Sequence, residues 1–126
     1  MLSAFFSSNV YVRVNRNQFR LRHIESGTDT TVQSDTPFTT QRLLIGDFTA
    51  AERTLKAALK RVVNSRLISI SPRVLIQPLE MIEGGLSQVE DRVLREVAIG
   101  AGASKVIVWV GSELADSDVT EKLNGK

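Results

Sequence analysis

The stretch that decides the fold is Pro72–Val110, PRVLIQPLEMIEGGLSQVEDRVLREVAIGAGASKVIVWV. It begins and ends with short, mostly apolar runs, RVLIQ at 73–77 and KVIVWV at 105–110, which are typical of strands buried on both faces of a parallel sheet. Between them, apolar residues recur at the spacing of an amphipathic helix: Val89, Val93, Leu94, Val97 and Ala98. Gly100 and Gly102 favour the end of that helix. Strand, helix and strand in succession predict a right-handed βαβ unit.

Two glycines stand before the predicted helix, so the segment is either a phosphate-binding loop or a structural joint. Neither Gly-x-x-x-x-Gly-Lys-Ser/Thr nor Gly-x-Gly-x-x-Gly occurs at Gly84 and Gly85, and these are the patterns that phosphate loops need. Ser87 and Glu90 instead fit a capping box, whose side chains use the backbone donors that a phosphate would otherwise take. We therefore interpret the segment as a joint between a strand and a helix.

The N-terminal part of the chain shows a different periodicity. Apolar and polar side chains alternate over 10–14 and again over 19–23, on either side of Asn-Arg-Asn at 15–17. A period of two around an Asn-containing turn predicts a β-hairpin. The segment 25–46, rich in Ser, Thr and Asp, offers one short candidate strand at 30–33.

Another helix is predicted over about 49–64. Thr49 and Glu52 fit a capping box at its start, and we expect a last short helix after Asp116 or Ser117. The apolar residues of the first of these helices recur at helical spacing: Ala51, Leu55, Ala58, Leu59 and Val62.

The assembled order predicts an α/β fold with a mixed five-stranded sheet, in which an antiparallel β-hairpin meander joins the parallel βαβ unit. The 126 residues fit a single domain over 1–126. We expect residues 1–8 to form a flexible N-terminus.

Composition narrows the function classes. With 16 basic and 14 acidic residues the net charge is +2, which predicts no strong non-specific attraction to nucleic acid. The chain has no cysteine, and His23 is its single histidine, so we expect no zinc cluster, no metal and no cofactor. Apolar runs are far shorter than the roughly 20 residues of a membrane span, and a signal-peptide pattern is missing. We therefore expect a cytoplasmic protein.

Basic side chains form the surface that we predict to bind a partner. The hairpin arginines should project from one sheet face, because each alternates with an apolar residue. An ordinary solvated charged face and a nucleic-acid site are the two alternatives. The candidate interaction surface comprises Arg13, Arg16, Arg20, Arg22, Lys56 and Lys60.

Acidic residues carry a further alternative, a metal-dependent phosphoryl-transfer or nuclease enzyme. Such an enzyme needs carboxylates gathered at strand ends to hold cations. Glu80, Glu83, Glu90 and Asp91 are near one another in the sequence and Asp47 precedes a helix, but the hairpin strands contain no acid. Helix capping and solvated helix faces account for these acids better.

Several segments resemble the MreB family of bacterial actins, the rod shape-determining proteins. Pro72–Val74, Ser87–Arg92 and Ala98–Val106 are similar to a family segment that reads as a strand, TxVExRA, a helix, AGA and another strand. Ile45–Phe48 resembles the family's IADF, and Met1–Asn9 resembles its N-terminus. The resemblance covers one actin-like subdomain and implies a ribonuclease H-like fold.

The same resemblance implies that ATP hydrolysis is lost. The family's Asp-x-Gly-Thr phosphate loop falls on Arg13, Asn15 and Arg16, and the family's second phosphate loop lies beyond position 126. We therefore expect a non-enzymatic subdomain that acts by protein–protein contact, with a second copy of itself or with a cytoskeletal or envelope-assembly protein.

Two smaller expectations complete the sequence-based picture. The whole chain is also similar to a family of short, uncharacterised enterobacterial proteins, on Gln41–Ile45 and Leu79–Glu90, and that family carries a stress-induction label. Leu2, Phe5 and Phe6 allow at most a weak N-terminal membrane contact, because the segment is short and lacks Lys and Arg.

Overall fold

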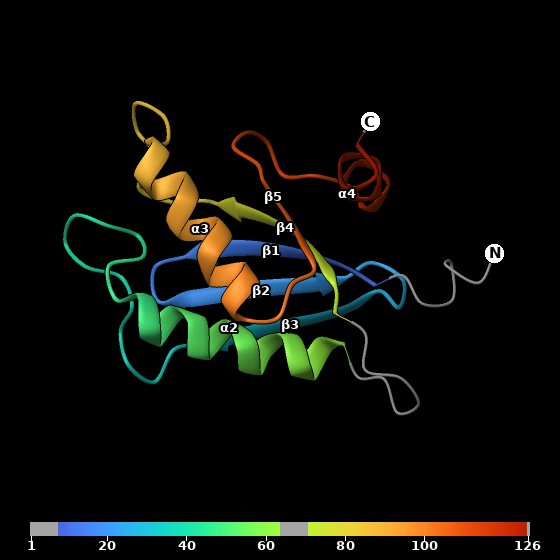
Figure 1. Ribbon diagram of the computed structural model, residues 1–126, viewed down its shortest axis with the longest axis horizontal. Helices are drawn as coiled ribbons and strands as arrows, with labels where there is room; N and C mark the ends of the chain where they lie inside the picture. Colours follow the sequence, from blue (N-terminus) through green and yellow to red (C-terminus); the bar gives the residue numbers. More distant parts are fainter. Residues whose placement is uncertain (1–7, 64–70, 126) are drawn as a thin grey trace.

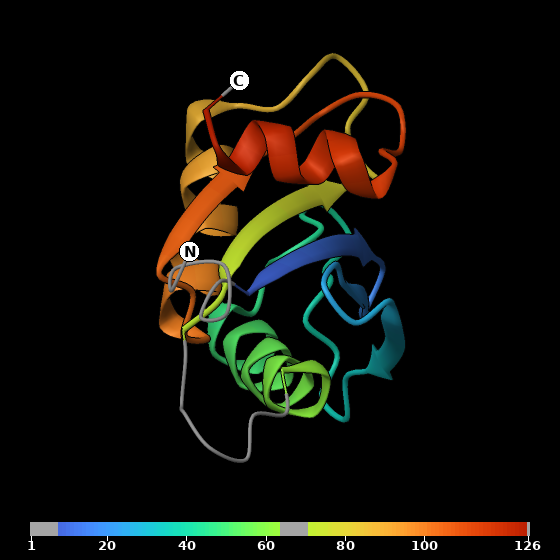
Figure 2. The ribbon, with the colours of Figure 1, turned by 90° about the vertical axis from the view of Figure 1, so that its right-hand side faces the viewer.

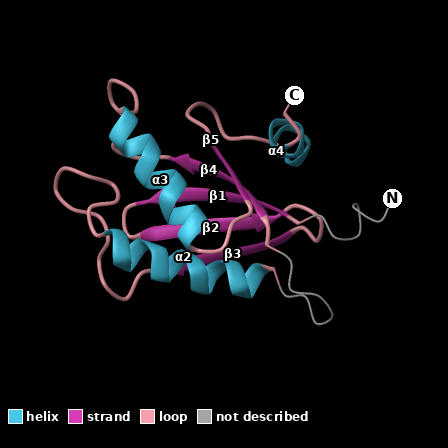
Figure 3. Ribbon diagram, viewed as in Figure 1, coloured by secondary structure: helices cyan, strands magenta, loops and turns pink. Residues whose placement is uncertain are grey.

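In the part of the chain that the structure describes, a mixed five-stranded sheet carries two helices on one face and one helix on the other (Figure 1). The computed structural model describes residues 8–63 and 71–125, so the predicted flexibility of 1–8 falls, apart from Ser8, outside this part of the chain. The elements, coloured by type in Figure 3, are β1 (Asn9–Asn15), β2 (Gln18–His23), β3 (Thr28–Gln33), α2 (Phe48–Val62), β4 (Arg73–Pro78), α3 (Gln88–Gly100), β5 (Lys105–Val108) and α4 (Asp116–Leu123).

The strand order in the sheet is β3-β2-β1-β4-β5. β1 pairs antiparallel with β2, and β2 pairs antiparallel with β3. β1 and β5 both lie parallel to β4. The predicted hairpin, the third strand and the βαβ unit are therefore all confirmed, and the third strand is two residues longer at its start than the predicted 30–33.

The period of two in β1 separates the two sheet faces. Val10, Val12 and Val14 are fully buried in the core formed with α2 and α3. Tyr11 faces the other way, into a smaller apolar cluster with Val119 of α4. Figure 2 shows α2 and α4 on opposite sides of the sheet. Arg13 follows the same alternation as Tyr11, so the α4 face holds the arginines.

Helix α2 begins earlier than its sequence pattern predicts. The N-cap is Asp47, whose carboxylate accepts the N–H of Ala50 at 3.0 Å, so the predicted capping box of Thr49 and Glu52 is wrong. The chain enters the helix where the N–H groups of Gly46 and Asp47 donate to the carbonyl oxygen of Phe38, at 2.8 and 3.0 Å. This tertiary contact fixes the first turn one residue before Thr49.

The identity of the cap predicts a difference between two alanine substitutions. Asp47→Ala should lower the free energy of unfolding by about 1 kcal/mol, because a buried helix donor loses its acceptor. Thr49→Ala, inside the first turn, should change it by less than about 0.5 kcal/mol. Urea denaturation measures both free energies of unfolding. A larger loss of stability for Thr49→Ala than for Asp47→Ala would indicate that Thr49 is the N-cap.

The joint before α3 has the predicted chemistry. Ser87 Oγ accepts the N–H of Glu90 at 3.1 Å, and the Glu90 carboxylate accepts the N–H of Ser87 at 2.9 Å, which confirms the capping box. Gly84 and Gly85 have φ of +80° and +92°, a region that residues with a Cβ adopt at a cost. Met81 nevertheless has a φ of +59°.

β5 differs from its predicted burial. The run at 105–110 has the composition of a strand covered on both faces, yet Val106, Ile107 and Val108 are only partly buried and Val110 is 40% exposed. β5 is the last strand in the sheet order, so its outer edge borders no other strand in the described part of the chain. Edge strands and central strands can both consist of β-branched residues, so the composition of the run could not show that β5 lies at the edge of the sheet.

Candidate functional site

The hairpin arginines lie on the α4 face of the sheet, where acids of the same chain meet them. Arg13 Nη1 and Arg20 Nη2 both approach Glu113 Oε1, at 3.4 and 3.1 Å. Arg22 makes a two-pronged contact with Asp116, at 2.8 and 3.1 Å, and its Nη1 lies 3.0 Å from Asp29. Three cations therefore face three carboxylates, and the formal charge of this group is balanced.

A buried polar network holds the acidic loop over the arginines. Gln77, fully buried, accepts a hydrogen bond from the Tyr11 hydroxyl and donates to the carbonyl oxygen of Gly111 at 2.7 Å. The N–H of Leu114 donates to the same Tyr11 hydroxyl at 3.1 Å. Burial raises the pKa of Tyr11, so its hydroxyl keeps the proton that it donates. The loop between Gly111 and Leu114 thus places Glu113 above the sheet.

Hydrogen bonds from Arg22 lower the pKa of Asp116 below its ordinary value, and the two carboxylates lift the pKa of Arg22. Both members of this contact therefore stay charged at neutral pH. Because both side chains are partly exposed to water, at 31% and 44%, solvent screens the pair and it contributes little to stability. Its main effect is to cancel positive charge on this face.

Arg16, at the hairpin turn, contacts Glu80 instead. The carboxylate accepts the backbone N–H of Arg16 at 2.7 Å and its Nε at 3.0 Å. The backbone hydrogen bond is the main cause of a lowered Glu80 pKa. An anionic group of this chain thus already occupies the turn.

The two lysines of the predicted surface lie elsewhere. Lys56 and Lys60 are exposed on α2, which covers the sheet face opposite to the arginines. The six candidate residues consequently form separate surfaces: the arginine face, the turn at Arg16, and the outer side of α2.

The acids of the alternative enzyme site have other contacts. Glu90 caps α3, Asp47 caps α2, and Asp91 pairs with Arg95 at 2.8 Å. Within residues 8–63 and 71–125 no three His, Cys, Asp or Glu side chains are grouped to hold a metal ion. His23 Nε2 lies 2.9 Å from Ser8 Oγ.

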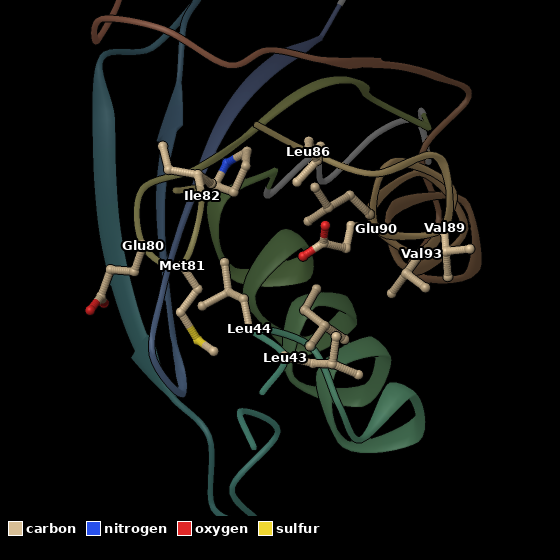
Figure 4. Close-up of a pocket in the computed structure, with 12 residues that line it drawn as sticks. Leu43, Leu44, Glu80, Met81, Ile82, Leu86, Val89, Glu90 and Val93 are labelled. Carbon is tan, nitrogen blue, oxygen red and sulfur yellow. The ribbon is translucent and has the colours of Figure 1, made fainter. Parts of the chain in front are cut away.

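An apolar groove is the feature that the sequence did not predict. It lies between the loop segment 43–45, the segment 78–82 after β4, and residues 86–94 at the start of α3 (Figure 4). Its rim exposes large aliphatic side chains, because Leu43 is 44% exposed and Val89 is 72% exposed. The groove has a volume of about 50 Å³.

Val89 shows why the groove escaped prediction. The sequence places it in the same helical stripe as Leu94 and Val97, which are buried. It lies in the first turn of α3, where the chain has just left the joint and the stripe has not yet reached the sheet. An apolar stripe therefore predicts which side of a helix faces the core. It does not predict at which residue along the helix the core ends.

Two expectations concern membranes. No described helix has the length and apolar character to cross a bilayer. The weak contact predicted through Leu2, Phe5 and Phe6 concerns residues outside the described part.

Comparison with known proteins finds a relative that matches over nearly the full length of both chains. The chain is 41% identical over 128 residues to the "Uncharacterized protein YjaA" of Escherichia coli (strain K12), and the match covers 94% of this chain and 99% of YjaA. No protein-family model matches the chain.

A second likeness is partial. The chain is 41% identical over 63 residues to the cell shape-determining protein MreB of Pasteurella multocida and 40% identical over 63 residues to that of Haemophilus influenzae. Each match covers 50% of this chain and 17% of the MreB chain. The chain thus spans only a small part of the length of these relatives.

Proposed function

The chain belongs to the YjaA family, and on that premise we propose that it is a stand-alone actin-like subdomain that binds another protein and does not hydrolyse ATP. The partial likeness to MreB supports the actin-like assignment. So does the strand order β3-β2-β1-β4-β5, which agrees with the ribonuclease H-like sheet that this likeness implies.

The hairpin turn supports the absence of ATP hydrolysis. Arg13, Asn15 and Arg16 stand where the MreB family has its Asp-x-Gly-Thr phosphate loop. The carboxylate of Glu80 accepts the backbone N–H of Arg16, a donor that a phosphate at this turn would need. A phosphate there would meet a carboxylate of like charge at short range, which disfavours binding.

The observation that carries the binding role is the apolar groove with its exposed rim. Burying one aliphatic side chain from water gains roughly 1.5–3 kcal/mol, whereas an exposed ion pair contributes about 0–1 kcal/mol. The arginine face is already matched by three acids, so a partner gains little there. The groove is therefore the better contact surface, and the partner is an actin-like cytoskeletal protein, an envelope-assembly protein or a second copy.

Affinity capture tests the proposal. Tagged protein at physiological salt should recover a specific protein from an Escherichia coli lysate, with purified MreB as a direct candidate, or light scattering should detect a defined oligomer. Recovery of nothing specific together with a monomer by light scattering would contradict the binding role. A thermal shift with Mg²⁺-ATP would contradict the non-ATPase half, and titration with Mg²⁺ or Mn²⁺ alone tests the alternative enzyme.

A further inference from the structure

From the groove and its charged rim we infer that the partner, under the proposed function on which this inference rests, contributes a short peptide segment that carries one large aliphatic anchor beside Lys or Arg. The anchor enters the apolar groove, and the basic side chains lie against the acids at its edge.

The volume of the groove limits the anchor to about one side chain. A water molecule needs roughly 10–15 Å³ of such space, so about 50 Å³ holds on the order of four waters or one aliphatic side chain. Pockets that enclose small-molecule ligands measure roughly 300–1,000 Å³. The groove therefore fits a single side chain better than a nucleotide or another cofactor.

A second, more open hollow continues the surface. Leu86 lines both hollows, and Val108 and Val110 of the β5 edge line the second one. Val89, on the helix between them, is 72% exposed. A segment whose anchor enters the groove can thus extend across the start of α3 and cover further apolar surface.

The acidic residues that line the groove favour basic residues beside the anchor in the partner peptide. Among the described residues, the charged side chains that line the two hollows are those of Glu80, Glu90 and Asp91, and all three are acidic. Glu80 and Asp91 each face an arginine of the chain. Glu90 accepts only the uncharged N–H of Ser87 and meets no cation within ion-pair distance in the described residues. A basic side chain of the partner would supply that missing charge.

The groove wall can also adapt to the anchor. Met81 lines the groove and holds a φ of +59°, which is uncommon for a residue with a Cβ and costs free energy. Its unbranched thioether side chain fits anchors of different shape. Met81 is partly buried against the main core and lines the groove, so its strained backbone lies where the core meets the proposed binding surface.

The test uses a random 12-residue peptide library displayed on phage and selected on the full-length protein. Recovered peptides should combine Leu, Ile, Met or Phe with Lys or Arg. Val89→Glu and Leu43→Glu should each weaken the affinity of these peptides by about tenfold or more, because the rim loses its apolar contact. Ile99→Glu is the matched control, since Ile99 is 52% exposed on the same helix and lies outside both hollows.

The variant Glu90→Gln tests the effect of the Glu90 charge on peptide binding separately from its capping role. Glutamine serves in a capping box, so α3 keeps its cap while the rim loses one negative charge. Peptide affinity should fall by about two- to fivefold at low salt, and the difference should disappear at high salt. Circular dichroism confirms that each variant is folded.

Three results of the peptide selection would overturn the inference: no recovered peptide, peptides rich in Asp and Glu, or peptides that bind Val89→Glu as tightly as the unchanged protein. A dimer that Val89→Glu dissociates would also overturn it, because a second copy of the chain would then occupy the groove. A lysate partner that both rim variants still capture would leave the proposed function intact and refute only the peptide groove. If the unchanged protein recovered no specific protein and light scattering showed only a monomer, the proposed function itself would be refuted.

Discussion

Replacing Phe19 with alanine should lower the free energy of unfolding by about 3–5 kcal/mol. Phe19, in β2, is fully buried, and its ring stacks on that of Phe38 with centroids 4.8 Å apart. The substitution loses the buried aromatic surface, leaves a cavity, and removes the stacking contact. For a chain of this length the loss corresponds to a fall in Tm of roughly 10–20 °C.

The effect should also reach the groove. The carbonyl oxygen of Phe38 accepts the N–H groups of Gly46 and Asp47, directly after the segment 43–45 that forms one groove wall. A loosened Phe38 therefore loosens that wall and the start of α2. Hydrogen exchange should show faster opening at Gly46 and Asp47 than at β4.

Phe48→Ala is the matched control. Phe48 is 36% exposed at the start of α2, so its truncation should cost only about 1–2 kcal/mol. Chemical denaturation of both variants measures the difference. An equal loss for Phe48→Ala would mean that the stack between Phe19 and Phe38 contributes nothing of its own.

The periodicity of apolar residues predicted most of the secondary structure, because alternate side chains of a strand lie on opposite faces of the sheet. The alternation over 10–14 sorts valines to one face and Tyr11 and Arg13 to the other, and this is what the sheet shows. The helical stripe of α2 likewise matches its buried residues. These patterns are local, and burial on one side enforces them.

Features that depend on contacts between distant segments could not be predicted. Thr49 and Asp47 are both good N-cap residues, and the hydrogen bonds that Gly46 and Asp47 donate to the carbonyl oxygen of Phe38 decide between them. The position of β5 at the sheet edge depends on strand order, which its composition does not encode. The exposure of Leu43 and Val89 depends on where the core ends.

The arginine face was predicted as a surface but not as a charge-balanced one. Two of its three acids lie about a hundred residues away in the chain: Glu113 reaches Arg13 across 100 positions and Asp116 reaches Arg22 across 94. Only the loop held by Tyr11 and Gln77 brings them together. The local spacing of the arginines alone therefore overstates the positive potential of this face.

Removing two of these acids should convert the face into a polyanion site. In the double variant Glu113→Gln, Asp116→Asn only Asp29 remains among the three acids that face Arg13, Arg20 and Arg22. The face then carries two more positive charges, which attract phosphates and release their counterions. Single-stranded DNA should bind about tenfold more tightly at low salt. The slope of log K against log salt should steepen by roughly 1.4, the value for two more phosphate contacts.

The control must change net charge equally without touching the arginine face. Asp91→Asn with Glu96→Gln removes two acids that pair with Arg95 and Arg92 on α3, so the net charge rises by the same amount. Fluorescence anisotropy across a salt series compares both variants with the unchanged protein. Equal gains would show that total charge governs DNA binding. A gain confined to the first variant shows that Glu113 and Asp116 keep this face from binding nucleic acid, which leaves the apolar groove as the surface for a partner.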